Sequence, residues 1–209
     1  MSQQTGESVR VYADYVCPFC YLGYASLDQY RDQREGPIRV EWQPFDLRGG
    51  QRRPDGTVHE SVDTGKDEAY FEEARRNVER LAEQYGVEMA QPLTEDVDSY
   101  DAQRVSLRVR EQQPDSFEQF HRAVFDALWE DGRDIGDPDV LQGLGAEAGL
   151  PEGFVAETLG EESSERELEA AFEDARQQRI TGVPTFVYGD HAARGAVPPG
   201  QLRRLIEGE

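Results

Sequence analysis

Two cysteines separated by two residues are the most reactive feature of this chain of 209 residues. Cys17 and Cys20 are its only cysteines, and they enclose Pro18 and Phe19. Two thiols at this spacing can close a small disulfide ring or ligate a metal ion, but they cannot staple distant parts of a fold. A predicted strand ends just before Cys17, and a predicted helix begins there. Because the positive end of a helix dipole favours an anion, we expect a stabilised thiolate at Cys17.

The positions of the two thiols predict different roles for them. Cys17 is the predicted nucleophile. Cys20, one helical turn further on, is the predicted resolving thiol, which attacks a mixed disulfide on Cys17. Pro18 suits the first turn of a helix, where a backbone N–H would have no partner. Three neighbours can be interpreted either as contacts that tune the thiols or as ordinary packing: Asp14, Tyr15 and Tyr21.

The pattern of apolar residues predicts a strand on each side of this motif. Residues 9–13 and 38–42 alternate between apolar and polar side chains, as half-buried strands do. Residues 22–30 instead have the period of an amphipathic helix, which should stop near residue 36. We therefore expect a β-α-β unit with a parallel pair of strands.

A long helical segment separates this unit from a second group of strands. Residues 46–65 are predicted to form an irregular connection, because they lack apolar periodicity. Helices are then expected at about 67–85, 98–112, 115–131 and 138–149, the last with Asp137 as its N-cap. A capping box of Ser164 and Glu167 predicts the start of a further long helix. The chain should end with strands at 185–188 and 191–194 and a helix at 199–206.

This order of elements predicts one fold class, a mixed α/β thioredoxin fold interrupted by a helical insertion. Residues 8–45 and 165–209 would form the thioredoxin-like domain, and residues 66–164 the inserted helical subdomain. The order, the Cys17–Cys20 motif and the segment around Val183 and Pro184 resemble the DsbA family, and within it the cytoplasmic FrnE-like branch, related to 2-hydroxychromene-2-carboxylate isomerases. The resemblance covers nearly the whole chain.

The resemblance implies roles for residues far from the cysteines. Pro184 should follow a cis peptide bond and lie against the active-site disulfide, and Val183 should offer its backbone to an extended substrate segment. The implied partners are cysteine-containing protein substrates and a thiol redox partner. No cofactor is implied beyond the Cys17–Cys20 disulfide, and glutathione remains open as a co-substrate. Strongly oxidising relatives carry histidine where this chain has Phe19, so we expect a potential between about −270 and −120 mV.

Two other functions stay open at this stage. Kappa-class glutathione transferases and 2-hydroxychromene-2-carboxylate isomerases share the architecture, so a glutathione-dependent enzyme acting on small molecules is the main alternative. Those relatives characteristically carry serine at the position of Cys17, which favours disulfide exchange. A non-catalytic binder that uses the groove near Val183 is a third hypothesis. A closed zinc site is not expected, since four ligands are needed and the three histidines are isolated: His59, His121 and His191.

The charge of the chain also excludes some partners. Asp and Glu number 43 against 22 Lys and Arg, which gives a formal net charge of −21. Nucleic acids and anionic membranes are therefore not expected as partners. The single lysine, Lys66, and the spread of acidic residues resemble proteins of halophiles. The polar N-terminus and the lack of a long apolar segment predict a cytoplasmic protein.

Two further groups of side chains are interpreted as structural. The aromatic residues between Phe117 and Trp129 lie on one face of a predicted helix, and we expect them to form core rather than to line a peptide groove. Arg48, Arg52 and Arg53 form a small basic group, which we interpret as part of a solvated loop.

Overall fold

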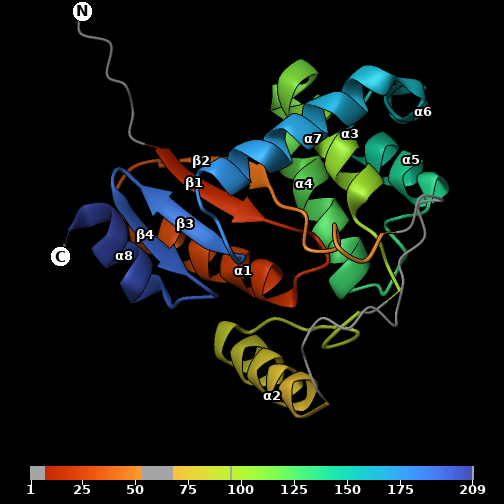
Figure 1. The fold of residues 1–209 in the computed structure, drawn as a ribbon. Coiled ribbons are helices and arrows are strands. Elements are labelled where there is room, and N and C mark those ends of the chain that lie inside the picture. The colour runs from red at the N-terminus through yellow and green to blue at the C-terminus, as the bar shows by residue number, and fades with distance from the viewer. Residues whose placement is uncertain (1–7, 53–67, 95, 209) are drawn as a thin grey trace, which may run out of the picture.

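A four-stranded sheet with helices on both faces forms the part of the molecule that carries the cysteines (Figure 1). The computed structural model describes residues 8–52, 68–94 and 96–208. In the sheet the strands have the order β2-β1-β3-β4, and their bounds are Ser8–Ala13 for β1, Arg39–Pro44 for β2, Thr185–Tyr188 for β3 and His191–Arg194 for β4. The expected parallel pairing of β1 with β2 is confirmed, and β3 is antiparallel to both of its neighbours.

Three helices cover this sheet. Helix α1 (Pro18–Gln33) connects β1 to β2 and packs beside the C-terminal helix α8 (Pro199–Glu207) on one face. Helix α7 (Glu162–Gln177) packs along β2 on the other face. The buried side chains of β1, among them Val9 and Val11, and those of β3 fill the space between these layers. The result is the α/β thioredoxin fold that the order of elements predicts.

The remaining helices form the insertion between β2 and β3. They are α2 (Glu68–Tyr85), α3 (Tyr100–Gln112), α4 (Pro114–Trp129), α5 (Pro138–Glu147) and α6 (Phe154–Gly160). Helices α3 to α6 pack against one another and α7, whereas α2 lies apart and contacts α1 through its buried residues Val78, Leu81 and Tyr85 (Figure 1). None of the helices in the described residues is long and apolar enough to cross a membrane.

The structure corrects two local predictions in this region. Helix α6 was not expected, and it is only one to two turns long. The predicted capping box is wrong, because α7 begins at Glu162, and Ser164 lies within its first turn. The Ser164 hydroxyl donates to the carbonyls of Thr158 and Glu161 at the end of α6 instead of capping α7. The proposed division between residues 164 and 165 therefore falls inside α7.

Other local predictions agree with the structure. Asp137 caps α5, since its carboxylate accepts a hydrogen bond from the backbone N–H of Asp139. The helix predicted at about 67–85 ends where expected, and Gly86, which follows it, has φ +67°, a conformation that favours glycine. The aromatic face of α4 is mostly core: Phe120, Phe125 and Trp129 are buried. Phe117, at the start of that face, is only partly buried.

Candidate active site

Cys17 lies at the point where β1 has ended and α1 begins. It is the N-cap residue of α1, and Pro18 occupies the first helical position. The carbonyl of Cys17 accepts hydrogen bonds from the backbone N–H groups of Cys20 and Tyr21, which closes the first turn. No acidic residue lies in this turn. The positive end of the helix dipole therefore faces the Cys17 sulfur without a competing carboxylate in that turn.

The second part of the site comes from the segment before β3. The Val183–Pro184 peptide bond is cis, as the resemblance implies. The Cys17 thiol donates to the carbonyl oxygen of Val183, with 3.6 Å between Sγ and O. Two residues that are 166 positions apart in the sequence thus meet at the reactive sulfur.

Gly23 allows this approach. A Cβ at this position of α1 would lie 3.0 Å from Pro184 Cγ and 3.3 Å from Phe186 Cζ. Both distances are tighter than ordinary van der Waals contact, so any larger residue would push the Pro184 segment away from α1. Sequence reasoning missed Gly23, because a glycine inside a predicted helix carries no sign of what packs on it.

The two thiols differ in their surroundings. Cys17 keeps 4% of its surface exposed, whereas Cys20 has none. Burial, followed by the hydrogen bond that the Cys20 thiol donates to Cys17 and by the charge of Cys17, raises the pKa of the Cys20 thiol well above its ordinary value. At neutral pH Cys20 is therefore a protonated thiol shielded from solvent, and Cys17 is the more exposed of the two thiols.

Asp14 is a buried carboxylate directly beneath the motif. It accepts hydrogen bonds from the backbone N–H groups of Val16, at 3.2 Å, and Leu47, at 2.8 Å, and from the Ser99 hydroxyl. Its backbone carbonyl accepts from the N–H of Cys17. Complete burial outweighs these bonds and raises the pKa of Asp14 to about 6. Asp14 thus ties the end of β1 to the loop after β2 and to the start of α3.

The other predicted neighbours of the thiols have different contacts. The Tyr21 hydroxyl donates to Glu130, the residue that follows α4, and the Tyr15 hydroxyl lies 2.6 Å from both Ser106 Oγ and His121 Nδ1. Phe19 is partly buried and packs against the core clusters on both sides of α1. Tyr15 and Tyr21 therefore connect the motif to the helical insertion.

The histidines are dispersed in the structure. His121 is buried among aromatic side chains of the helical insertion, and His191 is exposed on β4. His59 and Arg53 lie outside the described residues. The interpretation of the basic group as a solvated loop is wrong for Arg52, which forms ion pairs with Asp46 and Asp98.

Cys17 lies at the start of the first helix, and Cys20 lies one turn later. The segment of Val183 and Pro184 contacts the Cys17 sulfur, so the three parts together define a dithiol site on a thioredoxin fold. Comparison with known proteins specifies the family. Residues 8–207 match the model of the DsbA-like thioredoxin domain, so the chain belongs to that family. The uncharacterized protein YwbO of Bacillus subtilis is 28% identical over 205 residues, which are 96% of each chain.

Solved structures share the fold. A protein described as a probable DsbA oxidoreductase from Streptomyces coelicolor has a TM-score of 0.80 at 22% identity, over 97% of this chain and 91% of its own. A 2-hydroxychromene-2-carboxylate isomerase has a TM-score of 0.69 at 18% identity, over 90% and 88%. The cytosolic disulfide reductase DsbM of Pseudomonas aeruginosa, solved with glutathione, has a TM-score of 0.63 at 20% identity, over 95% and 92%.

Proposed function

We propose that this protein is a thiol-disulfide oxidoreductase that exchanges disulfides with cysteine-containing proteins through Cys17 and Cys20. The observation that carries the proposal is the position of Cys17, at the N-terminus of α1 and 3.6 Å from the Val183 carbonyl. A sulfur in this position faces the positive end of the α1 dipole and is next to a backbone segment that a substrate can pair with.

The chemistry needs no cofactor. In the reductive direction, the Cys17 thiolate attacks one sulfur of a substrate disulfide, a mixed disulfide forms, and the other substrate sulfur leaves as a thiolate. Cys20 then loses its proton and attacks the Cys17 sulfur. This second step releases the remaining substrate thiolate and leaves a Cys17–Cys20 disulfide, so the protein is oxidised by two electrons and the substrate is reduced. The oxidative direction is the same sequence reversed.

The raised pKa of Cys20 makes its deprotonation the demanding part of the second step. Asp14 is the candidate group that tunes this step, because its charge is among the contributions that raise the pKa of Cys20. Protonation of Asp14 near its own pKa of about 6 would remove that contribution. Phe19, beside the thiols, contributes no charge to either of them.

Substrate binding is proposed to use the Val183 segment. Main-chain pairing with an extended peptide is independent of the peptide's side chains, so it suits an enzyme with many protein substrates. Val183 is partly exposed, and Cys17 shows only a small part of its surface. A substrate disulfide would therefore have to approach along this segment to reach the sulfur.

Matched serine variants test the proposal. The probe is a peptide with one intramolecular disulfide, mixed with Cys20→Ser or with Cys17→Ser in parallel and then analysed by mass spectrometry after acid quenching. We expect a stable adduct of peptide and protein with Cys20→Ser, which keeps the nucleophile and lacks the resolving thiol. Cys17→Ser should give none. Equal adduct formation by the two variants would refute the assigned roles.

A redox titration then determines the direction of exchange. The wild-type protein is equilibrated with graded ratios of reduced and oxidised glutathione, free thiols are alkylated, and the products are weighed. A single two-thiol transition is expected, and its midpoint distinguishes a reductant from an oxidant. If no intramolecular disulfide forms at any ratio, glutathione-dependent isomerase activity on small aromatic compounds becomes the function to assay.

We also propose a cytoplasmic location. Both cysteines lie within the candidate site, so the protein does not depend on an oxidising compartment for structural disulfides. The neighbour from Pseudomonas aeruginosa is described as cytosolic. Cell fractionation followed by immunoblotting would test this proposal, and recovery of the protein outside the cytoplasm would contradict it.

A further inference from the structure

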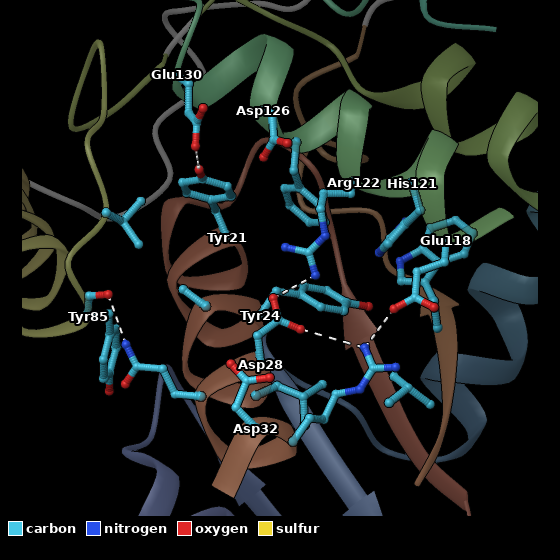
Figure 2. A pocket seen from close by; sticks show the side chains of 18 of the residues that line it. Tyr21, Tyr24, Asp28, Asp32, Tyr85, Glu118, His121, Arg122, Asp126 and Glu130 are labelled. Carbon is cyan, nitrogen blue, oxygen red and sulfur yellow. Dashed lines mark hydrogen bonds and ion pairs between the residues drawn. The ribbon is translucent and has the colours of Figure 1, made fainter. Parts of the chain in front are cut away.

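A cavity lies beside α1 (Figure 2). Its volume is about 1120 Å³, and α1, β2, α4 and the segment after α2 form its walls. This volume is slightly larger than that of typical small-molecule pockets, which is roughly 300–1,000 Å³. Neither Cys17, Cys20, Val183 nor Pro184 lines it, so it is separate from the site described above.

Aromatic rings form one wall of this cavity. His121 stacks on Phe117 with 5.2 Å between the ring centroids, and Tyr24 meets His121 edge-on at 5.0 Å. Trp42 of β2 lies 5.3 Å from the His121 ring, and Phe125 lies 5.3 Å from the Tyr24 ring. These five residues all line the cavity. A flat apolar group would find several rings to pack against there.

Three polar atoms in this wall have no hydrogen-bond partner among the residues that the structure describes. They are Tyr24 Oη, Trp42 Nε1 and His121 Nε2, and all three are closed to water. The Trp42 and His121 side chains are 1% and 6% exposed. Buried polar groups in proteins are nearly always paired, so three unpaired ones from three different elements in one cavity wall point to a missing partner. Figure 2 shows Tyr24 and His121 extending toward each other across this wall.

The imidazole of His121 is held neutral. Burial, followed by the charges of Arg122 and Arg110, lowers the pKa of His121 to about 3. Its Nδ1 is already bonded to the Tyr15 hydroxyl at 2.6 Å. The indole N–H of Trp42 can only donate, and the Tyr24 hydroxyl can donate and accept. A single hydroxyl oxygen, which also does both, is therefore the group that best matches the three atoms.

Carboxylates gather in the cavity near the C-terminal end of α4. Asp126, Glu130 and Asp131 all line it, and the nearest cation, Arg122, is already paired with Asp28 at 2.6 Å. Burial and then the charge of Glu130 raise the pKa of Asp126 to about 6. Figure 2 shows Asp126 on α4 and Glu130 just after its end, with Glu130 pointing toward Tyr21 of α1. A positive charge at this end would relieve the repulsion among these carboxylates.

We propose that this cavity binds a small organic cation with an ammonium group at the Asp126 end and an aryl body that carries a hydroxyl against Tyr24, Trp42 and His121. The aryl body packs on the aromatic wall, and the ammonium lies near the carboxylates and within reach of the ring faces. Because the three unpaired atoms are closed to water, the hydroxyl reaches them when Tyr24, the partly exposed member of the group, changes rotamer.

Tyramine is the probe that tests this proposal, since it carries the hydroxyl and the ammonium at opposite ends of one ring. The reduced, uniformly ¹⁵N-labelled protein is titrated with tyramine, and the two tryptophan indole N–H signals are followed by NMR. Trp129 Nε1 already donates to the Tyr15 carbonyl, so its signal serves as an internal control. We expect the Trp42 signal to move and the Trp129 signal to stay, with the assignment made from Trp42→Phe.

Two related compounds separate the contributions to binding. Phenethylamine lacks the hydroxyl and 4-ethylphenol lacks the ammonium, and each should bind at least about tenfold more weakly than tyramine, which corresponds to about 1.4 kcal/mol. Asp126→Asn should weaken tyramine binding by a similar factor. Asp115→Asn, which removes the same charge from an exposed position of α4, should leave it unchanged.

Three outcomes would overturn the proposal. The first is an immobile Trp42 signal at all tyramine concentrations, and the second is equal affinity for tyramine and 4-ethylphenol. The third is equal affinity of Asp126→Asn and Asp115→Asn for tyramine. If Asp126→Asn does not fold, Tyr24→Phe is the second variant, and undiminished binding of tyramine by it would refute the hydroxyl contact.

Discussion

Replacing Asp14 by asparagine should change how the stability of this protein depends on pH. Burial raises the pKa of Asp14 from its ordinary value of 3.8 to about 6 in the folded protein. Between these two values the folded state holds a proton that the unfolded state has lost. Stability therefore falls as the pH rises from about 4 to above 6, which is the opposite of the usual behaviour of a carboxylate in an ion pair.

The size of this effect follows from the two pKa values. A difference of about 2.2 corresponds to ~3 kcal/mol of free energy of unfolding, lost in full above about pH 7. Roughly 1.4 kcal/mol of this stabilisation is lost between pH 5 and pH 7.5. This range avoids the isoelectric point, near pH 4.5, at which the solubility of the protein is lowest. Asparagine cannot ionise, so the variant lacks this part of the pH dependence.

Urea unfolding of the reduced proteins at constant salt measures the effect. The quantity to compare is the free energy of unfolding of Asp14→Asn minus that of the wild type. The variant loses part of the hydrogen bonding to Val16, Leu47 and Ser99, at a cost of about 1–3 kcal/mol that does not vary with pH. The difference should therefore start negative and become more positive by roughly 1.4 kcal/mol from pH 5 to pH 7.5.

The exposed Asp115→Asn is the control, because it removes one carboxylate without touching the buried cluster. A difference for Asp14→Asn that stays constant or becomes more negative with pH would refute the reasoning. It would mean that the three hydrogen bonds outweigh burial and that Asp14 is ionised in the folded protein throughout this range.

Three more perturbations test other parts of the structure. Gly23→Ala places a Cβ 3.0 Å from Pro184 Cγ, so it should destabilise the protein by about 1–3 kcal/mol and slow disulfide exchange at Cys17. If the stability in urea and the rate of peptide reduction are both unchanged, the packing argument is wrong. Asp137→Ala removes the N-cap of α5 and should lower the free energy of unfolding by ~1 kcal/mol. A loss below about 0.3 kcal/mol, which is roughly the error of the measurement, would show that the cap is unimportant. Raising the potassium chloride concentration from about 0.1 M to 1 M shortens the Debye length from about 10 Å to 3 Å. Because the net charge is −21, screening should reduce the repulsion within the folded protein and raise its melting temperature. A constant melting temperature would show that this repulsion does not limit stability.

Local sequence patterns predicted the elements that carry the thiols. Alternation identified β1 and its parallel partner β2, and the helical period after Cys20 identified α1. These predictions succeed because strand and helix periods depend on neighbouring residues alone. The same reasoning overlooked α6, which has only seven residues, and it misinterpreted Ser164, whose hydroxyl bonds to carbonyls at the end of α6. A cap motif and a tertiary contact look alike in the sequence.

The sequence by itself determined that the two thiols lie three positions apart and that Cys17 is the one at a helix N-terminus, since both facts depend on residues a few positions apart. Only the tertiary structure decided that Gly23 leaves room for Pro184, that Asp14 is fully buried, and that His121 meets rings from α1 and β2. Each of these contacts joins segments far apart in the chain. Packing, and not periodicity, brings them together, and burial then sets their hydrogen bonding and their pKa values.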